Sequence, residues 1–533
     1  MATKHETFCF DNLDKIISGP DWEDKEGNAK ASMEEAEGYL GRPRILLGRK
    51  NYLAQHWEKR WEDVVARTMT VSEQPEGNGT ELRTNSEERR TEEINTLIND
   101  VFNEVRALFS RWLRMQNFCV LAGAGCSKCK GGPLGQDLFE RCKEVLKISK
   151  IGTQAKGFYA DVLQTLRDLP GLDQPFDFEE FLSFLSAARR CFAGGQGSFK
   201  DGFYIKPSNY PKRKRFDGSL VNELLDAIEK AISVVCNLSL SKEDELLESN
   251  CPSEKLAHLA FISKILSRDP TLGRVRLATT NYDTLFEQAM DRLSVYYADG
   301  FIGTVNRRFQ PGAFRLDVYY PGEIAEGRVR RYDRFLHVYK LHGSITWRRT
   351  ISSVNDPFGI SCDTSSFPSF EEIIGQQARL RDALTDPVTG NHIGLGILPT
   401  SAKYGETLTM PFSHLFRVFA NAVMEPQTVC FVIGYSGWDL HINRLVEDAL
   451  ASPSFTLVII DPGTKPKKWA SLMLRSDRSD RVYWFGGDWA RFERFVHDLL
   501  PDVEQMNTER DVAKQLKEIQ RSRIPSGISN GGG

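Results

Sequence analysis

The chain has 533 residues, of which 41% are hydrophobic and 26% are charged, and its formal net charge is −3. It is longer than a usual domain of roughly 100–200 residues, so we expect one large domain with additions, or two to three domains. No apolar run reaches the roughly 18 residues of a transmembrane helix, and the balanced charge gives no general support for nucleic-acid binding. The first residues lack the basic and then apolar pattern of a secretory signal, so we expect a cytoplasmic protein.

Residues 1–115 are predicted to form a helical extension. Apolar residues recur at three- and four-residue spacing over 51–69, which indicates a helix. The polar stretch over 71–85 has no period and is typical of a flexible linker. A second, longer helix is expected after this linker, and it leads the chain to a strand that begins at Phe118.

Four short strings each begin with an apolar run that is typical of a buried strand, and each then breaks at small or polar residues. Ligands of an open parallel sheet bind outside the carboxyl ends of its strands, so the four polar clusters are predicted to meet in one crevice. The strings are FCVLAGAGCS (118–127), RLATTNYDTLFE (276–287), YKLHGSITW (339–347) and FVIGYSGWD (431–439).

The remaining segments supply helices and further strands. Strands that alternate with helices predict an α/β fold, namely a doubly wound, mostly parallel, Rossmann-like sheet with a large helical insertion and an N-terminal helical extension. The last residues, 501–533, are expected to form a helix and a disordered tail. Helical spacing occurs at 176–190, 219–235 and 254–267, within an insertion of about 150–270, and at 412–424, while buried strands are expected at 455–463 and 481–489.

The first string has the residues of a phosphate cradle. Gly123 and Gly125 let backbone amides approach a pyrophosphate closely, and the helix that follows would present its positive end. The pattern is neither GxGxxG nor a P-loop, so alone it is equally compatible with a tight strand-to-helix turn. Cys126 and Cys129 form the only CxxC pair, and no second pair completes a zinc site, so two thiols in a tight loop are the preferred interpretation.

The second and third strings supply candidates for acid–base chemistry. Asn281 and Asp283 follow a strand at the start of a helix, where an amide and a carboxylate can orient a ribose, a carboxamide or a water. Helix capping by Thr280, Asn281 or Asp283 is the structural alternative, and it explains one of the three. His342 beside Gly343 can act as a general base with room for substrate, although a lone histidine is more often structural.

The fourth string repeats the order of strand, glycine, hydroxyl and carboxylate. Tyr435, Ser436 and Asp439 are candidates to hold a ribose or a phosphate, and the alternative is that they cap the helix that follows. Asp461 closes the next apolar run, where an acidic residue meets the adenosine ribose in dinucleotide-binding folds.

Taken together, the strings resemble the sirtuin superfamily, and more closely its prokaryotic sirtuin-like branch, whose members are NAD+-consuming effectors of antiphage defence. FEEFLSFL (178–185) and the segment with Pro399 and KYGE (403–406) also look like this branch, and the resemblance covers about 118–489. Four family motifs occur in the family's order, with GAGxS at 123–127, TxNxD at 279–283, HG at 342–343 and GxS at 434–436.

The resemblance implies an NAD+-binding catalytic domain over 116–500. It implies that Asn281, Asp283 and His342 act in catalysis, and that NAD+ is consumed as a substrate. The residues that it places at NAD+, together with the residue-level arguments above, are Gly123, Ala124, Gly125, Ser127, Thr280, Gly343, Gly434, Tyr435, Ser436, Asp439 and Asp461.

Protein-deacetylating sirtuins carry a four-cysteine zinc ribbon after the HG dipeptide, whereas only Cys362 lies between His342 and Cys430 here. The favoured activity is therefore that of an NAD+ glycohydrolase, which yields nicotinamide and ADP-ribose, as an abortive-infection effector without zinc. A protein deacylase, an ADP-ribosyltransferase and a non-enzymatic module that senses NAD+ or ADP-ribose stay open as alternatives. By resemblance we expect a homo-oligomer or a partner such as a HerA-type ATPase, and neither a membrane nor nucleic acid as a direct partner.

Overall fold

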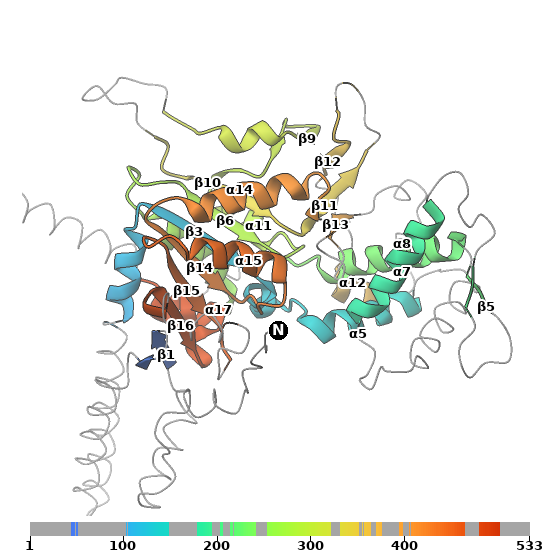
Figure 1. Ribbon diagram of the computed structural model, residues 1–533, viewed down its shortest axis with the longest axis horizontal. Coiled ribbons are helices and arrows are strands. Elements are labelled where there is room, and N and C mark those ends of the chain that lie inside the picture. The colour runs from blue at the N-terminus through green and yellow to red at the C-terminus, as the bar shows by residue number, and fades with distance from the viewer. Residues whose placement is uncertain are drawn as a thin grey trace, which may run out of the picture.

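The computed structural model describes the chain in segments separated by gaps. Their residues form a central sheet with helices on both faces and a bundle of helices beside it (Figure 1). Within these segments, no helix has both the length and the apolar character that crossing a membrane requires. The described residues are 44–47, 50–51, 103, 105–148, 178–193, 203–205, 214–216, 218–240, 253–320, 331–350, 354, 356–363, 369–375, 394–397, 405, 407–463, 469 and 479–501.

Among the described residues, seven parallel strands form the body of the central sheet. From β3 the chain order runs outward through β6 to β10, and after a crossover it runs the other way from β14 through β15 to β16. This is a doubly wound topology, so the predicted α/β fold is confirmed. The order across the sheet is β16 (Val482–Gly486), β15 (Thr456–Ile460), β14 (Thr428–Ile433), β3 (Asn117–Ala122), β6 (Val275–Thr279), β10 (Phe335–Lys340) and β7 (Tyr296–Ala298).

The two strands at the centre of this sheet are buried on both faces. All six residues of β3 and all six of β14 are buried. Successive side chains of a strand point to opposite faces, so Phe118 and Val120 enter the core on one face, while Cys119 and Leu121 enter the core on the other. Strands that are buried on both faces need a continuous apolar run, and this is the pattern that predicted them.

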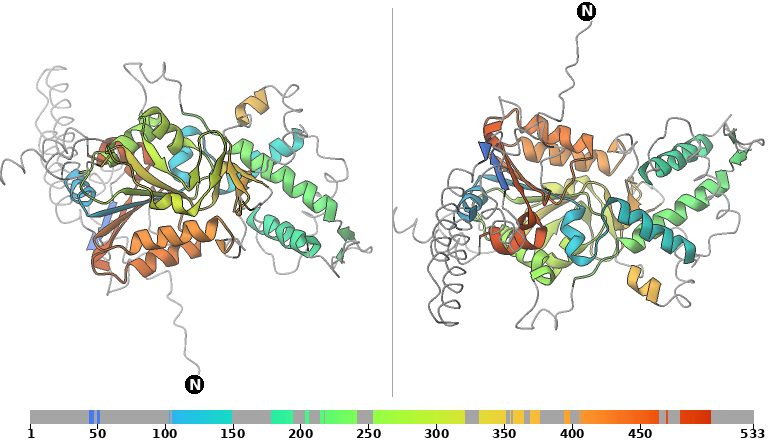
Figure 2. Two further views of the ribbon diagram at one scale, coloured as in Figure 1. Left: turned by 90° about the horizontal axis from the view of Figure 1, so that it is seen from above. Right: turned by 90° about the horizontal axis from the view of Figure 1, so that it is seen from below.

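Helices cover both faces of the sheet (Figure 2). On one face lie α10 (Ser253–Leu266), α11 (Leu285–Arg292) and a helix over 105–113. On the other lie α14 (Phe412–Met424) and α15 (Leu440–Ala449). Helical spacing predicted α10 and α14 to within a few residues, because each presents an apolar stripe to the sheet.

A bundle beside the sheet consists of α5 (Gly135–Ile148), α7 (Phe178–Ala193) and α8 (Gly218–Val235), as Figure 1 shows. It has a hydrophobic core of its own, to which all three helices contribute. The segment expected as one helical insertion, about 150–270, is therefore divided in the structure. Its helices α7 and α8 belong to the bundle, whereas α10 packs on the sheet.

A second, antiparallel sheet lies next to the central one, and no sequence pattern predicted it. Four of its five strands have only two or three residues, which is too short for a period to be seen. Because only two residues separate the end of β10 from the start of β11, this sheet is attached where the four strings meet. Its order is β13 (Gly394–Gly396), β11 (Gly343–Arg349), β12 (Ile360–Cys362), β9 (Arg307–Phe309) and β8 (Phe301–Ile302).

Part of the N-terminal extension joins the central sheet. Strand β1 (Arg44–Leu47) pairs antiparallel with β16, and β2 (Lys50–Asn51) pairs with β1. The helix over 105–113 also packs on this sheet, through Phe109. The domain boundary expected at residue 115 stays a prediction. It can be tested by removing the contacts that these N-terminal residues make with the sheet.

Several predicted segments fall outside the described residues. The helix expected over 51–69 is one, apart from Asn51 in β2, and the longer helix is described only at residue 103 and over 105–113. The others are the linker over 71–85, the KYGE motif apart from Gly405, and the C-terminal helix and tail apart from residue 501.

Candidate functional site

The four sequence strings meet at one end of the central sheet. Strands β14, β3, β6 and β10 are parallel neighbours, so their carboxyl ends lie side by side. The chain order reverses between β3 and β14, and open α/β sheets bind ligands at such a switch point. Backbone hydrogen bonds tie the loops together, from Thr280 N to Ala122 O at 3.0 Å and from Leu341 N to Thr279 O at 2.9 Å.

The glycines of the first and fourth strings pack against each other. The Gly123 N–H donates to the Ile433 oxygen at 2.9 Å, and the Gly125 N–H donates to the Gly434 oxygen at 2.8 Å. A Cβ at Gly123 would lie 2.6 Å from the Gly434 oxygen, and one at Gly125 would lie 2.7 Å from the Gly434 Cα. Only glycine allows two backbones to approach so closely, and Gly434 also has a left-handed φ of +59°.

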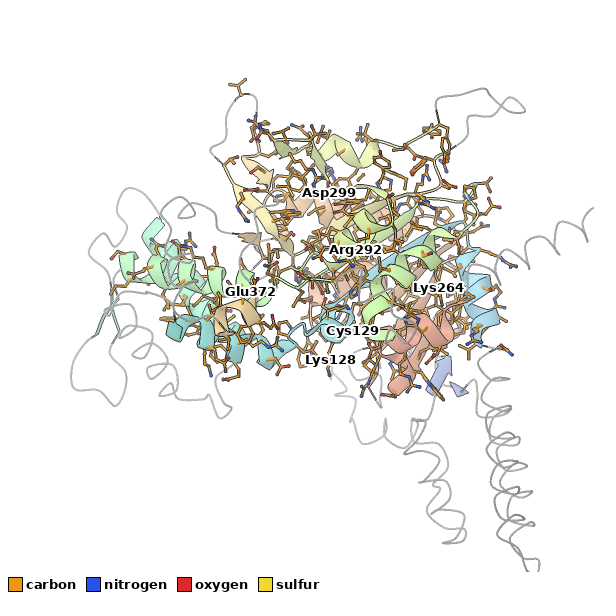
Figure 3. The ribbon with its side chains drawn as sticks, turned by 180° about the vertical axis from the view of Figure 1, so that it is seen from behind. Lys128, Cys129, Lys264, Arg292, Asp299 and Glu372 are labelled. Atoms are coloured by element: carbon orange, nitrogen blue, oxygen red, sulfur yellow. The ribbon has the colours of Figure 1, made fainter. Side chains whose placement is uncertain are left out.

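Ala124 stands at the tip of this loop. The N–H groups of Gly123 and Gly125 already donate to backbone carbonyls. Ala124, in contrast, is exposed at the start of the short helix η1 (Ala124–Lys130). The turn around Ala124 is thus the part of the loop that an anion can reach. In Figure 3 the labels Lys128 and Cys129 mark η1.

The two thiols of the CxxC pair are held inside this loop. The Cys126 thiol donates to the Ile433 oxygen at 3.3 Å, and the Cys129 thiol donates to the Cys126 oxygen at 3.5 Å. Burial raises the pKa of Cys126 well above its ordinary value, which keeps its thiol protonated. A protonated, hydrogen-bonded thiol is a poor nucleophile.

Asn281, Ser127 and Asp283 form a buried hydrogen-bonded chain across the switch point. The Asn281 amide nitrogen donates to the Gly123 oxygen at 3.0 Å and to Ser127 Oγ at 2.9 Å. The Ser127 hydroxyl in turn donates to Asp283 Oδ2 at 2.6 Å. Residues of the first and second strings therefore hold one another in place, and no more than 6% of any of the three residues is exposed.

The amide oxygen of Asn281 is the open end of this chain. The Gly123 oxygen can only accept a hydrogen bond, so the Asn281 nitrogen must face it and the amide oxygen must point away. That oxygen is buried and has no hydrogen-bond partner among the described residues. A buried acceptor left in this way costs roughly 1–3 kcal/mol, and a donor on a ligand removes that cost.

Asp283 also fixes the start of α11. Its Oδ1 accepts the Leu285 N–H at 3.1 Å, while Oδ2 accepts the Ser127 hydroxyl. Of the three residues considered as caps, Asp283 thus binds the amide at the first residue of the helix. The backbone amides of Thr280 and Asn281 make other hydrogen bonds. The Thr280 N–H donates to the Ala122 oxygen of β3, and the Asn281 N–H donates to Thr279 Oγ1 at 3.1 Å.

His342 follows β10 at the turn into β11, and only 5% of the residue is exposed. Gly343 makes that turn with a φ of +89°, which glycine adopts without strain. The His342 oxygen accepts the Ile397 N–H at 2.8 Å, and the Ile397 oxygen accepts the Tyr282 hydroxyl. Ile397 thereby joins the loop of Asn281 to the loop of His342.

Residues 275–476 match the family model described as the SIR2-like domain. The match begins at the first residue of β6, and it includes Asn281, His342 and Gly434. This chain contains a sirtuin-like domain. A comparison with curated proteins gives no match.

The glycine loop of the first string precedes the matched residues, yet several hydrogen bonds join it to the SIR2-like domain. Asn281 donates to the Gly123 oxygen, Ser127 donates to Asp283, and Gly125 donates to Gly434. The site is therefore built from both sides of the match boundary, and the GAGCS loop is part of it.

The fourth string divides into structural and accessible residues. Tyr435 is 3% exposed, and its hydroxyl accepts the Asp439 N–H at 3.2 Å and donates to Asn443 Oδ1 at 3.3 Å. Tyr435 therefore closes the loop ahead of α15, whereas Ser436 is exposed. Asp461 directly follows β15 at the same edge of the sheet, and its Oδ1 accepts the Gly463 N–H at 3.1 Å.

A buried ion pair beneath the site was missed by the sequence reasoning. Lys340 is 2% exposed, and its ammonium donates to the Asp283 backbone oxygen and lies 3.0 Å from Glu287 Oε1. Burial raises the pKa of Glu287, and Lys340 opposes that rise. The sequence feature that could have predicted this ion pair is the lysine itself, because a charge at the end of the apolar run FLHVYK needs a buried partner.

Proposed function

We propose that the SIR2-like domain hydrolyses the glycosidic bond between nicotinamide and ribose in NAD+. The observation that carries this proposal is the buried Asn281 amide oxygen at the switch point, which lacks a partner among the described residues. A ribose hydroxyl or a water supplies the donor that this oxygen needs. Use of NAD+ is the general function of the matched family, and the hydrolysis of NAD+ is the proposed step beyond it.

The dinucleotide would lie along the carboxyl edge of the sheet. Its pyrophosphate would meet the exposed turn at Ala124, and its adenosine ribose would meet Asp461. The nicotinamide ribose would then face Asn281 and His342. The other contacts proposed from the sequence are Gly123, Gly125, Ser127, Thr280, Gly343, Gly434, Tyr435, Ser436 and Asp439.

The reaction breaks the bond between ribose C1′ and the nicotinamide nitrogen. The bonding electron pair leaves with nicotinamide, which is cationic in NAD+ and neutral as a product, so no general acid is required. A water oxygen forms the new bond to C1′ through an oxocarbenium-like state, and one water proton is released. Asn281 would orient the water or the ribose, and His342 would bond the ribose or accept the released proton.

The test is the mass spectrum of NAD+ after incubation with the purified full-length chain, alone and with the product of the neighbouring gene. We expect nicotinamide and ADP-ribose, and we expect Asn281→Ala and His342→Ala each to abolish their release while the protein stays folded. His337→Gln is the matched control, because His337 is also a buried histidine of β10, roughly 15 Å before His342 along the strand. Wild-type rates in both site variants would contradict the site assignment.

The same experiment separates the alternative functions. O-acetyl-ADP-ribose released from an acetylated peptide would indicate a deacylase, and NAD+ bound without turnover would indicate a sensing module. Between His342 and Cys430 the chain has only Cys362, whose half-buried thiol lies 3.6 Å from Thr346 Oγ1. A four-cysteine ribbon has no ligands there, which favours hydrolysis of NAD+ over deacylation.

The biological setting is part of the proposal. Unrestrained NAD+ hydrolysis would kill its own cell, so the activity fits a cytoplasmic effector of abortive infection that an antiphage trigger releases. By resemblance, that restraint would come from homo-oligomerisation or from a partner such as a HerA-type ATPase. Light scattering of the chain, alone and mixed with its genomic neighbour, tests both forms of assembly.

A further inference from the structure

Two histidines and an aspartate converge beside the candidate site. His342 lies in the turn that follows β10, and Asp439 and His441 lie at the start of α15. One ligand atom from each of the three side chains lies within 4.8 Å of the other two. The imidazole rings of His342 and His441 have centroids 6.0 Å apart, with 33° between their planes.

The local backbone explains how residues 439 and 441 reach the same point. Residues two apart do not share a face of a helix, but Asp439 is the N-cap residue and has an extended backbone, with φ −82° and ψ 92°. Its carboxylate can therefore turn toward His441, which is already in the helix. The His441 ring packs against Phe416, with centroids 5.1 Å apart, and this contact limits its orientation.

Two imidazoles and one carboxylate are the donor set of a three-ligand zinc site with an open fourth position. Ligand bonds of about 2.0–2.2 Å would place the ligand atoms roughly 3.3 Å apart, so the present separations close by about 1.5 Å at most. The positive end of α15 opposes a cation, and the Asp439 carboxylate at that end offsets it. Leu440, between two of the ligands in the sequence, is 75% exposed, so this turn lies at the protein surface.

We propose that His342, Asp439 and His441 bind one divalent transition-metal ion of the Zn2+ type. This site is distinct from a four-cysteine ribbon, because it uses no thiol. A ring nitrogen of His342 that coordinates an ion cannot also bond a ribose or take a proton at that nitrogen. If the domain hydrolyses NAD+ as proposed, metal binding therefore switches that hydrolysis off. This consequence rests on the proposed function.

Metal binding is tested without reference to activity. The full-length chain is first stripped with a chelator and then titrated with Co2+, whose visible absorption reports the geometry and the ligand type. We expect one equivalent to bind with nitrogen and oxygen ligands, and we expect His441→Gln and Asp439→Asn each to weaken binding by about 10-fold or more. The control His337→Gln removes a buried histidine outside the cluster and should bind as the wild type does.

Two outcomes would overturn the site. One is unchanged Co2+ affinity in both His441→Gln and Asp439→Asn, which would make the cluster a structural contact only. The other is a thiolate charge-transfer band, which would place the ion at cysteines. Circular dichroism of each variant shows whether the fold is retained, and a third variant, His441→Asn, repeats the test with a smaller side chain.

The regulatory consequence has its own readout. Saturating Zn2+ should lower the wild-type rate of NAD+ hydrolysis by about 10-fold or more, a chelator should restore it, and His441→Gln should be insensitive to Zn2+. If the chain binds Co2+ through these residues but never hydrolyses NAD+, the metal site stands and the proposed function fails. If Zn2+ does not change the rate of an active wild type, the proposed switch fails and the proposed function stands.

Discussion

Ser127 and Asp283 are 156 positions apart in the sequence, yet the Ser127 hydroxyl donates a 2.6 Å hydrogen bond to the Asp283 carboxylate. The same oxygen accepts the Asn281 amide at 2.9 Å. One serine therefore orients both polar residues of the second string. Its replacement by alanine leaves a buried carboxylate oxygen without this donor, which costs roughly 1–3 kcal/mol.

We expect Ser127→Ala to lower the kcat/KM of NAD+ hydrolysis by about 10- to 100-fold, because the Asn281 amide loses a fixed position. Steady-state kinetics and thermal unfolding measure the two effects. Ser413→Ala, on α14, is the control and should change neither. A wild-type rate in Ser127→Ala would mean that this serine does not position Asn281.

The close contact between the two glycine loops yields a second prediction. Gly123→Ala places a Cβ 2.6 Å from the Gly434 oxygen, so the loops must separate. We expect a loss of about 1–3 kcal/mol in the free energy of unfolding, typical of overpacking, together with weaker NAD+ hydrolysis. Urea denaturation measures the first and the kinetic assay the second.

Gly312→Ala is the matched control for this substitution. Nothing lies within 4 Å of a Cβ at Gly312, so we expect a change within about 0.5 kcal/mol. Equal stability of the two variants would show that the loops of Gly123 and Gly434 are not packed as described.

The sequence predicted six strands of the central sheet, β3, β6, β10, β14, β15 and β16, because these strands carry their own signal, whereas β7, β1 and β2 were not predicted. β3 and β14 are continuous apolar runs buried on both faces, and such runs are typical of the buried centre of a parallel sheet. The second sheet carries no such signal, since β8 has two residues and β9 three. Strands of this length are fixed by their partners, and a partner distant in sequence is invisible to a local pattern.

The candidate site shows the same division between what is local and what is not. Asn281 and His342 could be named because each follows an apolar strand directly. The sequence could not show why a glycine is needed at position 123, because the close contact is with Gly434, more than 300 residues later. The same holds for Lys340, whose partner Glu287 comes from a different element of the fold.

The helix over 105–113 gives a third prediction, which bears on the domain boundary expected at residue 115. Phe109 is fully buried, and its ring centroid lies 5.0 Å from that of Phe485, 5.3 Å from that of Phe495 and 5.5 Å from that of Phe431. Phe109→Ala removes this packing from the face of the sheet. We expect a loss of about 3–5 kcal/mol in the free energy of unfolding, measured by chemical denaturation.

Arg111→Ala, at an exposed position two residues later in the same helix, is the control and should change stability by about 0.5 kcal/mol or less. A Phe109→Ala variant as stable as this control would show that the helix is separable from the sheet. The boundary at residue 115 would then be supported.

The buried pair of Lys340 and Glu287 gives a prediction with a defined pH dependence. Burial raises the pKa of Glu287 above its ordinary value of 4.5, and the Lys340 ammonium, 3.0 Å away, limits that rise. A carboxyl group whose pKa is raised on folding binds more protons in the folded state. Its contribution to stability is therefore complete below its unfolded pKa and is lost as the pH rises through the folded pKa.

Lys340→Met removes the charge that limits this loss, so the pKa of Glu287 should rise further. We expect the variant to lose about 3–5 kcal/mol at neutral pH and less near about pH 4, where Glu287 is protonated in both states. Denaturant unfolding across this range measures the slope. The double variant Lys340→Met with Glu287→Gln removes the titrating group and should recover part of the lost stability at neutral pH. If the stability that Lys340→Met loses does not depend on pH, Glu287 is not the residue left unpaired.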